Sequence, residues 1–380
     1  MASLYVHIPF CERKCVYCDF YSIESRDLMD RFLRNLLAEA ERTRAFAAGT
    51  AFDTLFLGGG TPSLLSARQM ESLLGGLRSA FALRRDAEVS VEANPGTVDA
   101  ETLAAYRSLG VNRISIGAQS FHREELEFLG RIHSAEQAER CVRMARDAGF
   151  DNVSIDLIYS LPGQTRARWE ETLRRACGLG PDHVAAYSLI VEDQTPLARS
   201  VAEGLVIPNE TDAEAGLYEL TMRFMASEGF EHYEVSNYAR PGRRCSHNCA
   251  YWTHRNYLGL GPSAHSFWWP EGSGPARRWW NVASVTAYCE RLESGNVPVA
   301  SGEDLGGTTL VNEAILLGLR AQGIDIGRLR RDFSYEFQDR QRDLMTGLVG
   351  EGLATLEDGV FRLTDRGYVI CDEIARRLLV

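Results

Sequence analysis

The amino-acid sequence predicts an α/β fold, namely a partial (β/α)6 barrel of parallel strands that resembles an open TIM barrel. A small, mainly helical domain is expected to follow it. Six short apolar segments in the first two thirds of the chain alternate with segments of helical periodicity. This order is typical of a parallel sheet with right-handed crossovers. Six units are too few to close an eightfold barrel, so we expect a wide mouth; an open doubly wound sheet is the alternative.

The six predicted strands are the apolar runs at residues 4–8, 54–57, 89–93, 113–117, 153–157 and 184–189. Between them, residues 28–47, 66–80 and 135–148 carry apolar side chains at helical spacing, which predicts amphipathic helices. Two of these helices have a predicted start, because Ser66 precedes Gln69 and Ser134 precedes Gln137 as in a capping box.

The composition of the sequence changes near Glu231. Residues 231–282 are rich in Trp, Tyr, His, Asn and Gly, and residues 266–281 predict a hairpin with a Gly/Pro turn. Residues 294–307 are expected to be a linker. Helices at 311–320, 326–333 and 336–350, a hairpin at 353–363 and a last helix through Leu379 predict a winged-helix-like module. We therefore expect three regions: 1–230, 231–300 and 301–380.

The composition restricts the class of protein. The chain has 380 residues, 45% apolar content and a net charge of −11, which argues against a general nucleic-acid or anionic-membrane binder. Its nine cysteines are an odd number and mostly far apart, unlike the framework of a small secreted domain. No signal peptide or transmembrane run is visible. We expect a cytoplasmic protein.

Three cysteines near the N-terminus carry the strongest chemical signal. Cys11, Cys15 and Cys18 have the spacing C-x3-C-x2-C, with no fourth ligand nearby. A structural zinc site needs four ligands, whereas a [4Fe-4S] cluster takes one thiolate per iron. Three thiolates therefore favour a cluster whose fourth iron is open to a small molecule, and a zinc-binding scaffold is the alternative.

Polar residues follow the predicted strands at their C-terminal ends, where parallel barrels carry their functional groups. An inward carboxylate such as Asp156 costs several kcal/mol unless a partner or ligand compensates it. A glycine turn and a structural Asp156–Arg131 bridge are the alternatives to a binding site. The residues concerned are Gly59, Gly60, Thr61, Glu92, Gln119, Arg131 and Asp156.

The cysteine motif followed by an aromatic residue, Phe20, resembles the radical S-adenosylmethionine superfamily. The resemblance extends over essentially the whole chain to the branch that contains oxygen-independent coproporphyrinogen III dehydrogenase and HemW-type haem chaperones. It rests on residues 5–11, 58–63, 117–121, 129–134 and 154–163. It implies a [4Fe-4S] cluster on Cys11, Cys15 and Cys18. It also implies S-adenosylmethionine held by Tyr5, Gly59, Gly60, Thr61, Glu92, Gln119, Arg131 and Asp156.

Two departures favour the haem chaperones within this branch. The dehydrogenase carries a further cysteine two residues after the third, where this chain has Phe20. It also has a long extension before the cluster motif, whereas Cys11 lies ten residues into this sequence. The resemblance thus implies haem delivery to client haem proteins, including respiratory ones, with membrane contact only through such clients. Oxidative decarboxylation of coproporphyrinogen III is the alternative, so enzyme activity stays open.

Residues 247–252 form an HNxxYW motif with His247, Asn248, Tyr251 and Trp252. The resemblance to the haem chaperones implies that this motif takes part in haem binding. An imidazole suits haem iron, and the two rings suit a porphyrin face. Cys245 and Cys249 are alternative soft ligands, and a buried polar cluster without haem is the other interpretation. Cys141, Cys177, Cys289 and Cys371 are expected to be small buried side chains, and the Trp pairs 268–269 and 279–280 to pack in the hairpin.

Overall fold

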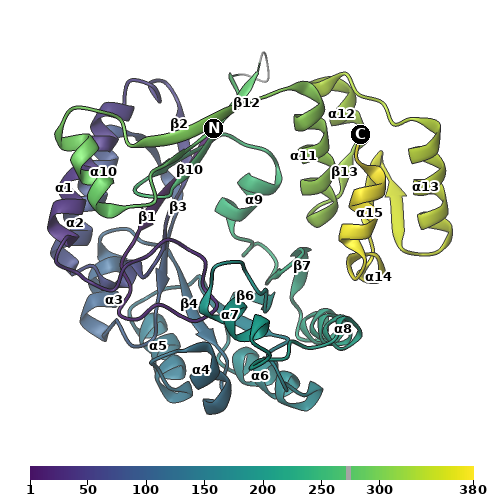
Figure 1. Cartoon of the computed structure of the whole chain (residues 1–380), viewed down its shortest axis with the longest axis horizontal. Helices are drawn as coiled ribbons and strands as arrows, with labels where there is room; N and C mark the ends of the chain where they lie inside the picture. Colours follow the sequence, from purple (N-terminus) through teal and green to yellow (C-terminus); the bar gives the residue numbers. More distant parts are fainter. Residues whose placement is uncertain (271–274) are drawn as a thin grey trace.

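The computed structural model describes residues 1–270 and 275–380, which form one large sheet and a small helical C-terminal region (Figure 1). The sheet has the strand order β12-β11-β10-β9-β1-β2-β3-β4-β5-β6-β8-β7. Strands β12 and β7 are its two edges, so the sheet is open and no barrel closes among the described residues. The predicted α/β class and the partial barrel are confirmed.

The six predicted strands lie side by side and parallel, as the order of elements requires. Each is longer than its apolar run by two to seven residues at one end or both, apart from the last, which is shifted by one. Their bounds are β1 Ala2–Ile8, β2 Ala51–Gly59, β3 Ala82–Ala93, β4 Arg113–Gln119, β5 Val153–Tyr159 and β6 His183–Ser188.

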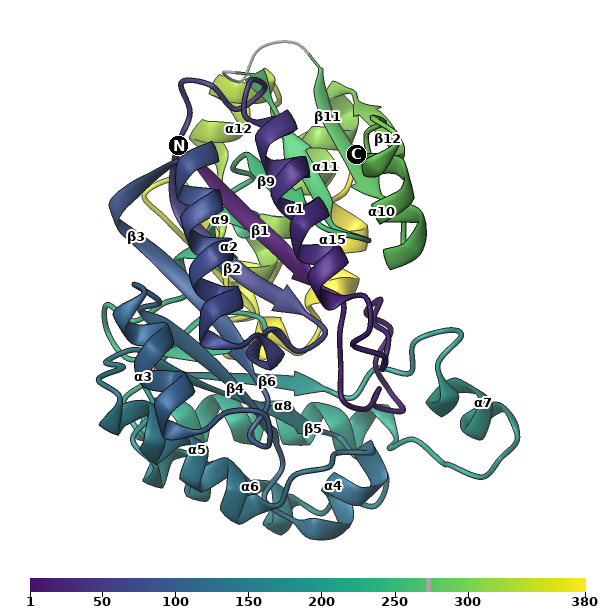
Figure 2. The same cartoon turned by 90° about the vertical axis from the view of Figure 1, so that its left-hand side faces the viewer.

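Helices cover the outer face of this sheet (Figure 2). Both predicted capping boxes are present, at Ser66 and at Ser134. The helices are α1 Met29–Thr43, α2 Ala67–Ala80, α3 Ala100–Ser108, α4 Arg123–Leu129, α5 Ala135–Asp147, α6 Arg166–Gly178, α7 Pro196–Ala202 and α8 Thr211–Ser227, with a 3₁₀ turn at Pro62–Leu64. Helix α7 lies on a projecting loop, and its Leu197 N–H donates to the Val16 carbonyl (2.9 Å) of the loop that follows β1.

The region after residue 230 extends the same sheet at both edges. Strands β7 (Glu231–Glu234) and β8 (Asn237–Ala239) continue beyond β6 in antiparallel pairing. Strand β9 (Tyr257–Leu260) instead pairs parallel with β1, on the side opposite β2. The first strand of the chain therefore lies inside the sheet.

The predicted hairpin is present as β10 (His265–Trp268) and β11 (Ala276–Asn281), although its turn at 271–274 lies outside the described residues. Trp268 and Trp279 pack edge-on against Phe46, which lies outside the hairpin, whereas Trp280 stacks on His265 across the hairpin as expected. The expectation of a linker at 294–307 is wrong for most of its length. Val299–Leu305 forms strand β12 on β11, because an unpaired β11 edge offers a full row of hydrogen bonds.

The C-terminal region is mainly helical and carries a small sheet in the order β13-β15-β14, in agreement with the winged-helix-like prediction. Asp358 and Gly359 both have positive φ (51° and 76°), the backbone of the two-residue turn predicted there. The elements are α10 Val285–Glu293, α11 Gly307–Arg320, β13 Ile324–Asp325, α12 Ile326–Phe333, α13 Asp339–Gly350, β14 Ala354–Glu357, β15 Val360–Leu363, α14 Asp365–Tyr368 and α15 Cys371–Leu378.

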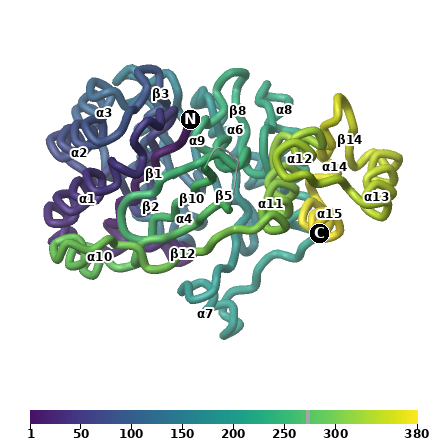
Figure 3. The backbone as a smooth tube through the Cα atoms, turned by 90° about the horizontal axis from the view of Figure 1, so that it is seen from above, coloured from purple at the N-terminus to yellow at the C-terminus, as the bar shows by residue number. Residues whose placement is uncertain are grey.

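A short helix, α9 (Ser246–Trp252), lies between the sheet and the C-terminal region (Figures 1 and 3). It contacts β1 and β2 on one side and α11 on the other. The HNxxYW motif forms this helix, so the two main parts of the molecule meet at the motif. None of the described helices has the length and apolar character that crossing a lipid bilayer requires.

Candidate functional site

The three cysteines of the motif lie on the loop that follows β1 and line a cavity of about 400 Å³. Strand-like bonds anchor the base of this loop, because Cys11 N–H donates to the Ile23 carbonyl (3.0 Å) and Ile23 N–H to the Pro9 carbonyl (2.9 Å). All three cysteines are free thiols and partly accessible. No three His, Cys, Asp or Glu side chains of the described residues converge on a single-ion site, so the thiols surround the cavity rather than meet at one point.

The groups beside these thiols fit an anionic iron–sulfur group. Arg131 donates from Nη1 to Cys15 Sγ (3.5 Å), and Thr61 donates from Oγ1 to Cys11 Sγ (3.5 Å). A cation and a hydroxyl at the sulfurs stabilise thiolates, which are the form that binds metal. Three thiolates with hydrogen-bond support are the donor set that a [4Fe-4S] cluster uses.

Two glycines at the end of β2 bring the backbone against the first strand. Gly59 has φ 107°, and a Cβ there would lie 2.6 Å from the His7 ring. A Cβ on Gly60 would lie 2.6 Å from the Phe10 carbonyl oxygen. Only glycine fits at these two positions, so the backbone there forms part of the cavity wall. His7 is held by hydrogen bonds to the Tyr5 hydroxyl (3.0 Å) and the Tyr21 carbonyl (2.8 Å).

Two carboxylates lie deep in the same cavity. Glu92 accepts one hydrogen bond, from Gly59 N–H at 3.2 Å, and burial raises its pKa to about 8, helped by the charge of Asp156. Asp156 accepts from the hydroxyls of Ser115 (2.8 Å) and Ser154 (3.2 Å), and burial also raises its pKa. Both groups therefore retain hydrogen-bonding capacity toward a ligand.

Arg131 and Gln119 complete the wall near the cluster loop. Arg131 donates to the Asn94 side chain and to the Gly117 carbonyl (2.7 Å), and it forms no ion pair with Asp156. The alternative of a structural bridge between those two residues is therefore wrong. Gln119 has φ 66° at a register irregularity of β4, a strained backbone of the kind found at binding sites. All the predicted S-adenosylmethionine residues but Tyr5 line this first cavity.

A second cavity, of about 220 Å³, continues inward from the first. The two share Gly59, Glu92 and Asp156, and Tyr5 lines the second one. Six strands do not close into a packed barrel centre, and this space is the result. Arg113, His183 and Asn237 are among its remaining lining residues, none of which the sequence analysis singled out.

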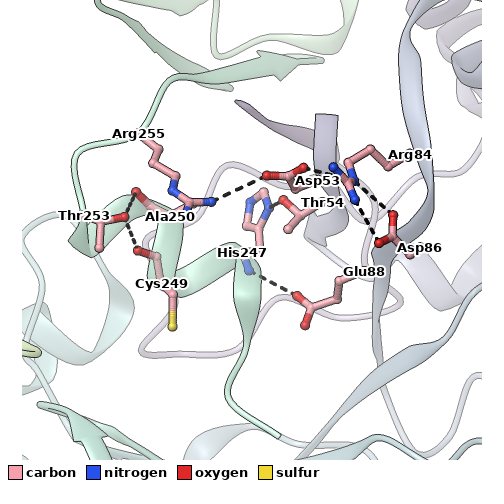
Figure 4. Close-up of polar contacts among 10 residues, drawn as sticks. All are labelled: Asp53, Thr54, Arg84, Asp86, Glu88, His247, Cys249, Ala250, Thr253 and Arg255. Atoms are coloured by element: carbon pink, nitrogen blue, oxygen red, sulfur yellow. Dashed lines mark hydrogen bonds and ion pairs between the residues drawn. The ribbon is translucent and has the colours of Figure 1, made fainter. Parts of the chain in front are cut away.

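His247 belongs to a saturated hydrogen-bond network. Its Nδ1 lies 2.7 Å from Thr54 Oγ1 (Figure 4). Its Nε2 lies 2.9 Å from Tyr251 Oη, and its ring stacks on Phe56. The side chain is 1% exposed, and burial lowers its pKa to about 3, so the imidazole is neutral. In this position neither ring nitrogen is available to a haem iron, which agrees with the interpretation of a buried polar cluster.

Glu88 fixes helix α9 at its N-terminal end. Its carboxylate accepts from Ser246 N–H (3.0 Å) and His247 N–H (3.1 Å), where the positive end of the helix favours an anion (Figure 4). The Cys245 thiol also points at Glu88 and is fully buried. Cys141, Cys289 and Cys371 are buried as predicted, whereas Cys177 and Cys249 are partly accessible.

A third cavity, of about 640 Å³, lies between α9, the β9–β11 strands and α11. Asn248 and Tyr251 line both this cavity and the second one, and Trp252 lines this one alone. Its other lining residues are mainly aromatic and aliphatic, with Arg255, Arg278, Glu234 and Glu313 as the charged ones. Three of the four motif residues therefore line the third cavity, whereas His247 lines only the second one.

The sequence analysis missed the pair formed by His254 and Glu313 at this third cavity. His254 donates from Nε2 to Glu313 Oε2 (2.8 Å), and its Nδ1 has no partner among the described residues. Arg278 binds both oxygens of the same carboxylate at 2.8 Å. No local signal could find this pair, because Glu313 lies 59 residues away on α11.

Comparison with known proteins places the chain in a family. Residues 5–176 match the model of the Radical SAM superfamily, and residues 307–370 match that of the HemN C-terminal domain. Haem chaperone HemW of Mycobacterium tuberculosis (strain H37Rv) is 37% identical over 382 residues, 99% of this chain and 94% of the relative. Haem chaperone HemW of Bacillus subtilis (strain 168) is 33% identical over 378 residues, 98% of each chain.

One solved structure matches over the whole length. Coproporphyrinogen III oxidase (HemN) of Escherichia coli superposes with a TM-score of 0.84 at 24% identity, covering 100% of this chain and 90% of that one. This match establishes the fold, including the open sheet and the helical C-terminal region. Together, the two family models and the full-length relatives show that the chain belongs to the HemW family within the Radical SAM superfamily.

Proposed function

We propose that this protein is a haem chaperone that binds haem in the third cavity and transfers it to client haem proteins in the cytosol. The observation that carries the proposal is the cavity beside Trp252. Its volume of about 640 Å³ is within the range of small-molecule sites, and aromatic rings make up much of its wall. The relatives that match over the full length are named haem chaperones.

The chemistry of the wall supports a tetrapyrrole. Trp252, Tyr257 and Phe267 supply flat apolar area for a porphyrin face, and Leu316 and Leu317 of α11 add aliphatic area. Arg255 and Arg278 also line the wall and are paired with Asp53 (3.5 Å) and Glu313 (2.8 Å), so a carboxylate of the ligand would compete with these partners. Because α9 and α11 both contribute, a small displacement of the C-terminal region would open the cavity for transfer to a client.

His254 is the imidazole that this proposal assigns to haem iron. Its Nε2 pairs with Glu313, and metal-ligating histidines usually bind a carboxylate through the second ring nitrogen. Its Nδ1 has no partner among the described residues and is enclosed, so the ring would have to move for this nitrogen to reach iron. His247 would instead hold Tyr251 in place.

The first cavity fits a [4Fe-4S] cluster on Cys11, Cys15 and Cys18 and S-adenosylmethionine on the residues beside it. A bound cluster would supply an iron with an open coordination position, which the methionine end of S-adenosylmethionine would chelate. Arg131 would pair with a carboxylate through its planar fork, and Glu92 and Asp156 would accept from hydroxyl or amino groups. Whether these cofactors act in chemistry or hold the fold is a separate question for the assay below.

An anaerobic titration of the cluster-loaded protein with haem tests the proposal, with the Soret band as the readout. We expect saturable binding by the wild type, weakened about tenfold or more in Trp252→Ala because one stacking ring is lost. Trp280→Ala is the matched control, since Trp280 stacks on His265 and lines none of the three cavities. A wild type without a Soret change would overturn the proposal.

Two further variants separate the histidines in the same titration. His254→Ala is expected to change the Soret maximum and the low-spin signature, and His247→Ala to keep both. A coproporphyrinogen assay with reductant and S-adenosylmethionine on the same preparation covers the alternative function. Protoporphyrin fluorescence in that assay would replace the chaperone with the decarboxylating enzyme.

A further inference from the structure

Arg113 occupies an unusual position for a charged residue. It is the first residue of β4, and its side chain reaches into the second cavity, inside the partial barrel. Only 2% of the residue is exposed, so the guanidinium is fully enclosed by protein. Arginine is rarely buried to this degree unless an anion pairs with it.

No such anion is in contact with Arg113. Among the described residues, none forms a hydrogen bond or an ion pair within 4.0 Å with its side chain, and its buried Nε has no partner. Its terminal nitrogens face the cavity, since they are not among the fully enclosed unpartnered atoms. The guanidinium therefore retains most of its five donor positions.

The charged groups around Arg113 do not neutralise it by contact. Glu88 is committed to the N-terminal end of α9, and Asp156 binds two serine hydroxyls. Glu92 binds the backbone of Gly59. These carboxylates act on Arg113 only over distances beyond a direct ion pair.

The two histidines on the same cavity are neutral. His183 uses both nitrogens, with Ser154 Oγ and Tyr233 Oη each at 2.8 Å. Burial, and then the charge of Arg113, lowers the pKa of both His183 and His247. The cavity thus presents one cation, together with the carboxyl groups of Glu92 and Asp156, to any ligand group that enters it. An unpaired buried cation costs several kcal/mol, which a bound carboxylate would offset.

The second cavity adjoins the third. Tyr187, Asn237, Asn248 and Tyr251 line both of them, and Tyr187 lines all three cavities. Neutral amides and hydroxyls at this junction are suited to a polar group that passes between the two spaces. A molecule held against Trp252 can therefore extend a side chain toward Arg113.

We propose that Arg113 binds a carboxylate of the ligand in the third cavity, which for a haem chaperone is a haem propionate. The inference rests on the proposed function and adds to it which part of haem enters the partial barrel and which residue selects it. Asn248, within the HNxxYW motif, would then act at the entrance, and the propionate would lie between the haem face and the first cavity.

Comparison of haem with its dimethyl ester tests this proposal, because esterification removes both propionate charges and leaves the macrocycle intact. We expect the wild type to bind the ester about 10- to 100-fold more weakly than haem, the range for losing a charged hydrogen bond. Arg113→Gln is expected to bind haem and ester alike, and Arg113→Lys to restore part of the preference. Arg84→Gln, whose side chain pairs with Asp86 on the surface, is the matched control and should behave as wild type.

The outcomes separate the two proposals. A wild type that binds neither compound overturns the proposed function itself. A wild type that binds both equally overturns the role of Arg113 alone, and this result needs no variant to fold. S-adenosylmethionine binding, measured by equilibrium dialysis, is expected to be the same in Arg113→Gln. If that variant loses S-adenosylmethionine and keeps the preference for haem, the carboxylate in the second cavity belongs to the cofactor and the proposal is wrong.

Discussion

Glu39 on α1 and Glu92 on β3 are both enclosed carboxylates, and their surroundings differ in one respect. Glu39 accepts three hydrogen bonds, from Gly261 N–H (2.8 Å), Asn281 Nδ2 (2.6 Å) and the Tyr288 hydroxyl. Glu92 accepts one and faces two connected cavities. Glu39 joins α1 to the β9–β11 side of the sheet and to α10. Glu92 instead has hydrogen-bonding positions that no protein group uses.

This difference distinguishes structural from functional polar groups in the molecule. A buried group whose hydrogen bonds are complete stabilises the fold, and one that is incomplete is costly unless a ligand completes it. By this criterion His247 belongs with Glu39, because both of its nitrogens are used. Arg113 belongs with Glu92.

The largest effect among the functional residues is expected when one cluster thiol is removed. Cys15→Ala should reduce iron and sulfide from about four of each per chain to near zero, because the remaining two thiolates hold a cluster poorly. Anaerobic iron and sulfide analysis measures this. Cys249→Ala is the matched control, a partly accessible cysteine outside the first cavity, and should keep full occupancy. Equal iron in both variants would remove the basis for the comparison.

Substitution of each of the two carboxylates by glutamine is expected to have an effect of intermediate size, with opposite patterns for Glu92 and Glu39. Glu92→Gln should weaken S-adenosylmethionine binding about 10- to 100-fold, because it replaces one carboxyl oxygen that faces the ligand with an amide nitrogen. Its melting temperature should match that of the wild type, since the amide oxygen still accepts from Gly59 and the carboxyl group, with a pKa of about 8, is itself mostly neutral at pH 7. Equilibrium dialysis and thermal unfolding measure the two quantities.

Glu39→Gln should show the opposite pattern, with S-adenosylmethionine affinity unchanged and the melting temperature reduced. Its three donors then compete for a weaker acceptor, at a cost of about 1–3 kcal/mol. If the two variants lose affinity and stability in the same proportion, the distinction between complete and incomplete polar groups does not hold.

The smallest expected effect is a pH dependence of stability. Burial raises the pKa of Glu39 to about 7, above the value near 4.5 of an exposed glutamate. Between these values the folded state keeps the proton and the unfolded state releases it. The free energy of unfolding therefore receives this contribution fully below pH 4.5 and loses it as pH rises through 7. Urea unfolding at pH 5 and pH 8 should differ by about 1–2 kcal/mol less in Glu39→Gln than in the wild type.

Local sequence signals predicted the elements that depend on local chemistry. The capping boxes at Ser66 and Ser134 formed because serine and glutamine three residues apart complete each other's hydrogen bonds. The cysteine loop and the strand-end residues came together because parallel strands end on the same side of a sheet.

Contacts distant in sequence could not be predicted in this way. His247 meets Thr54 across 193 residues, so its saturation has no local signal. Residues 299–305 have no apolar alternation, and they form β12 because β11 offers an edge. The absence of a partner for Arg113 is likewise a property of the folded packing.

The parallel pairing of β1 with β9 has a consequence for biosynthesis. Ser3 pairs with Tyr257 and Val6 with Leu260, so the strand that leads into the cluster loop is paired on one side only until those residues are made. Pairings this distant in sequence form late. A ribosome-bound chain would therefore display an uncovered strand edge beside its thiols for most of its synthesis. Delivery of iron and sulfide to the cluster loop is thus expected only after Leu260 has been synthesised.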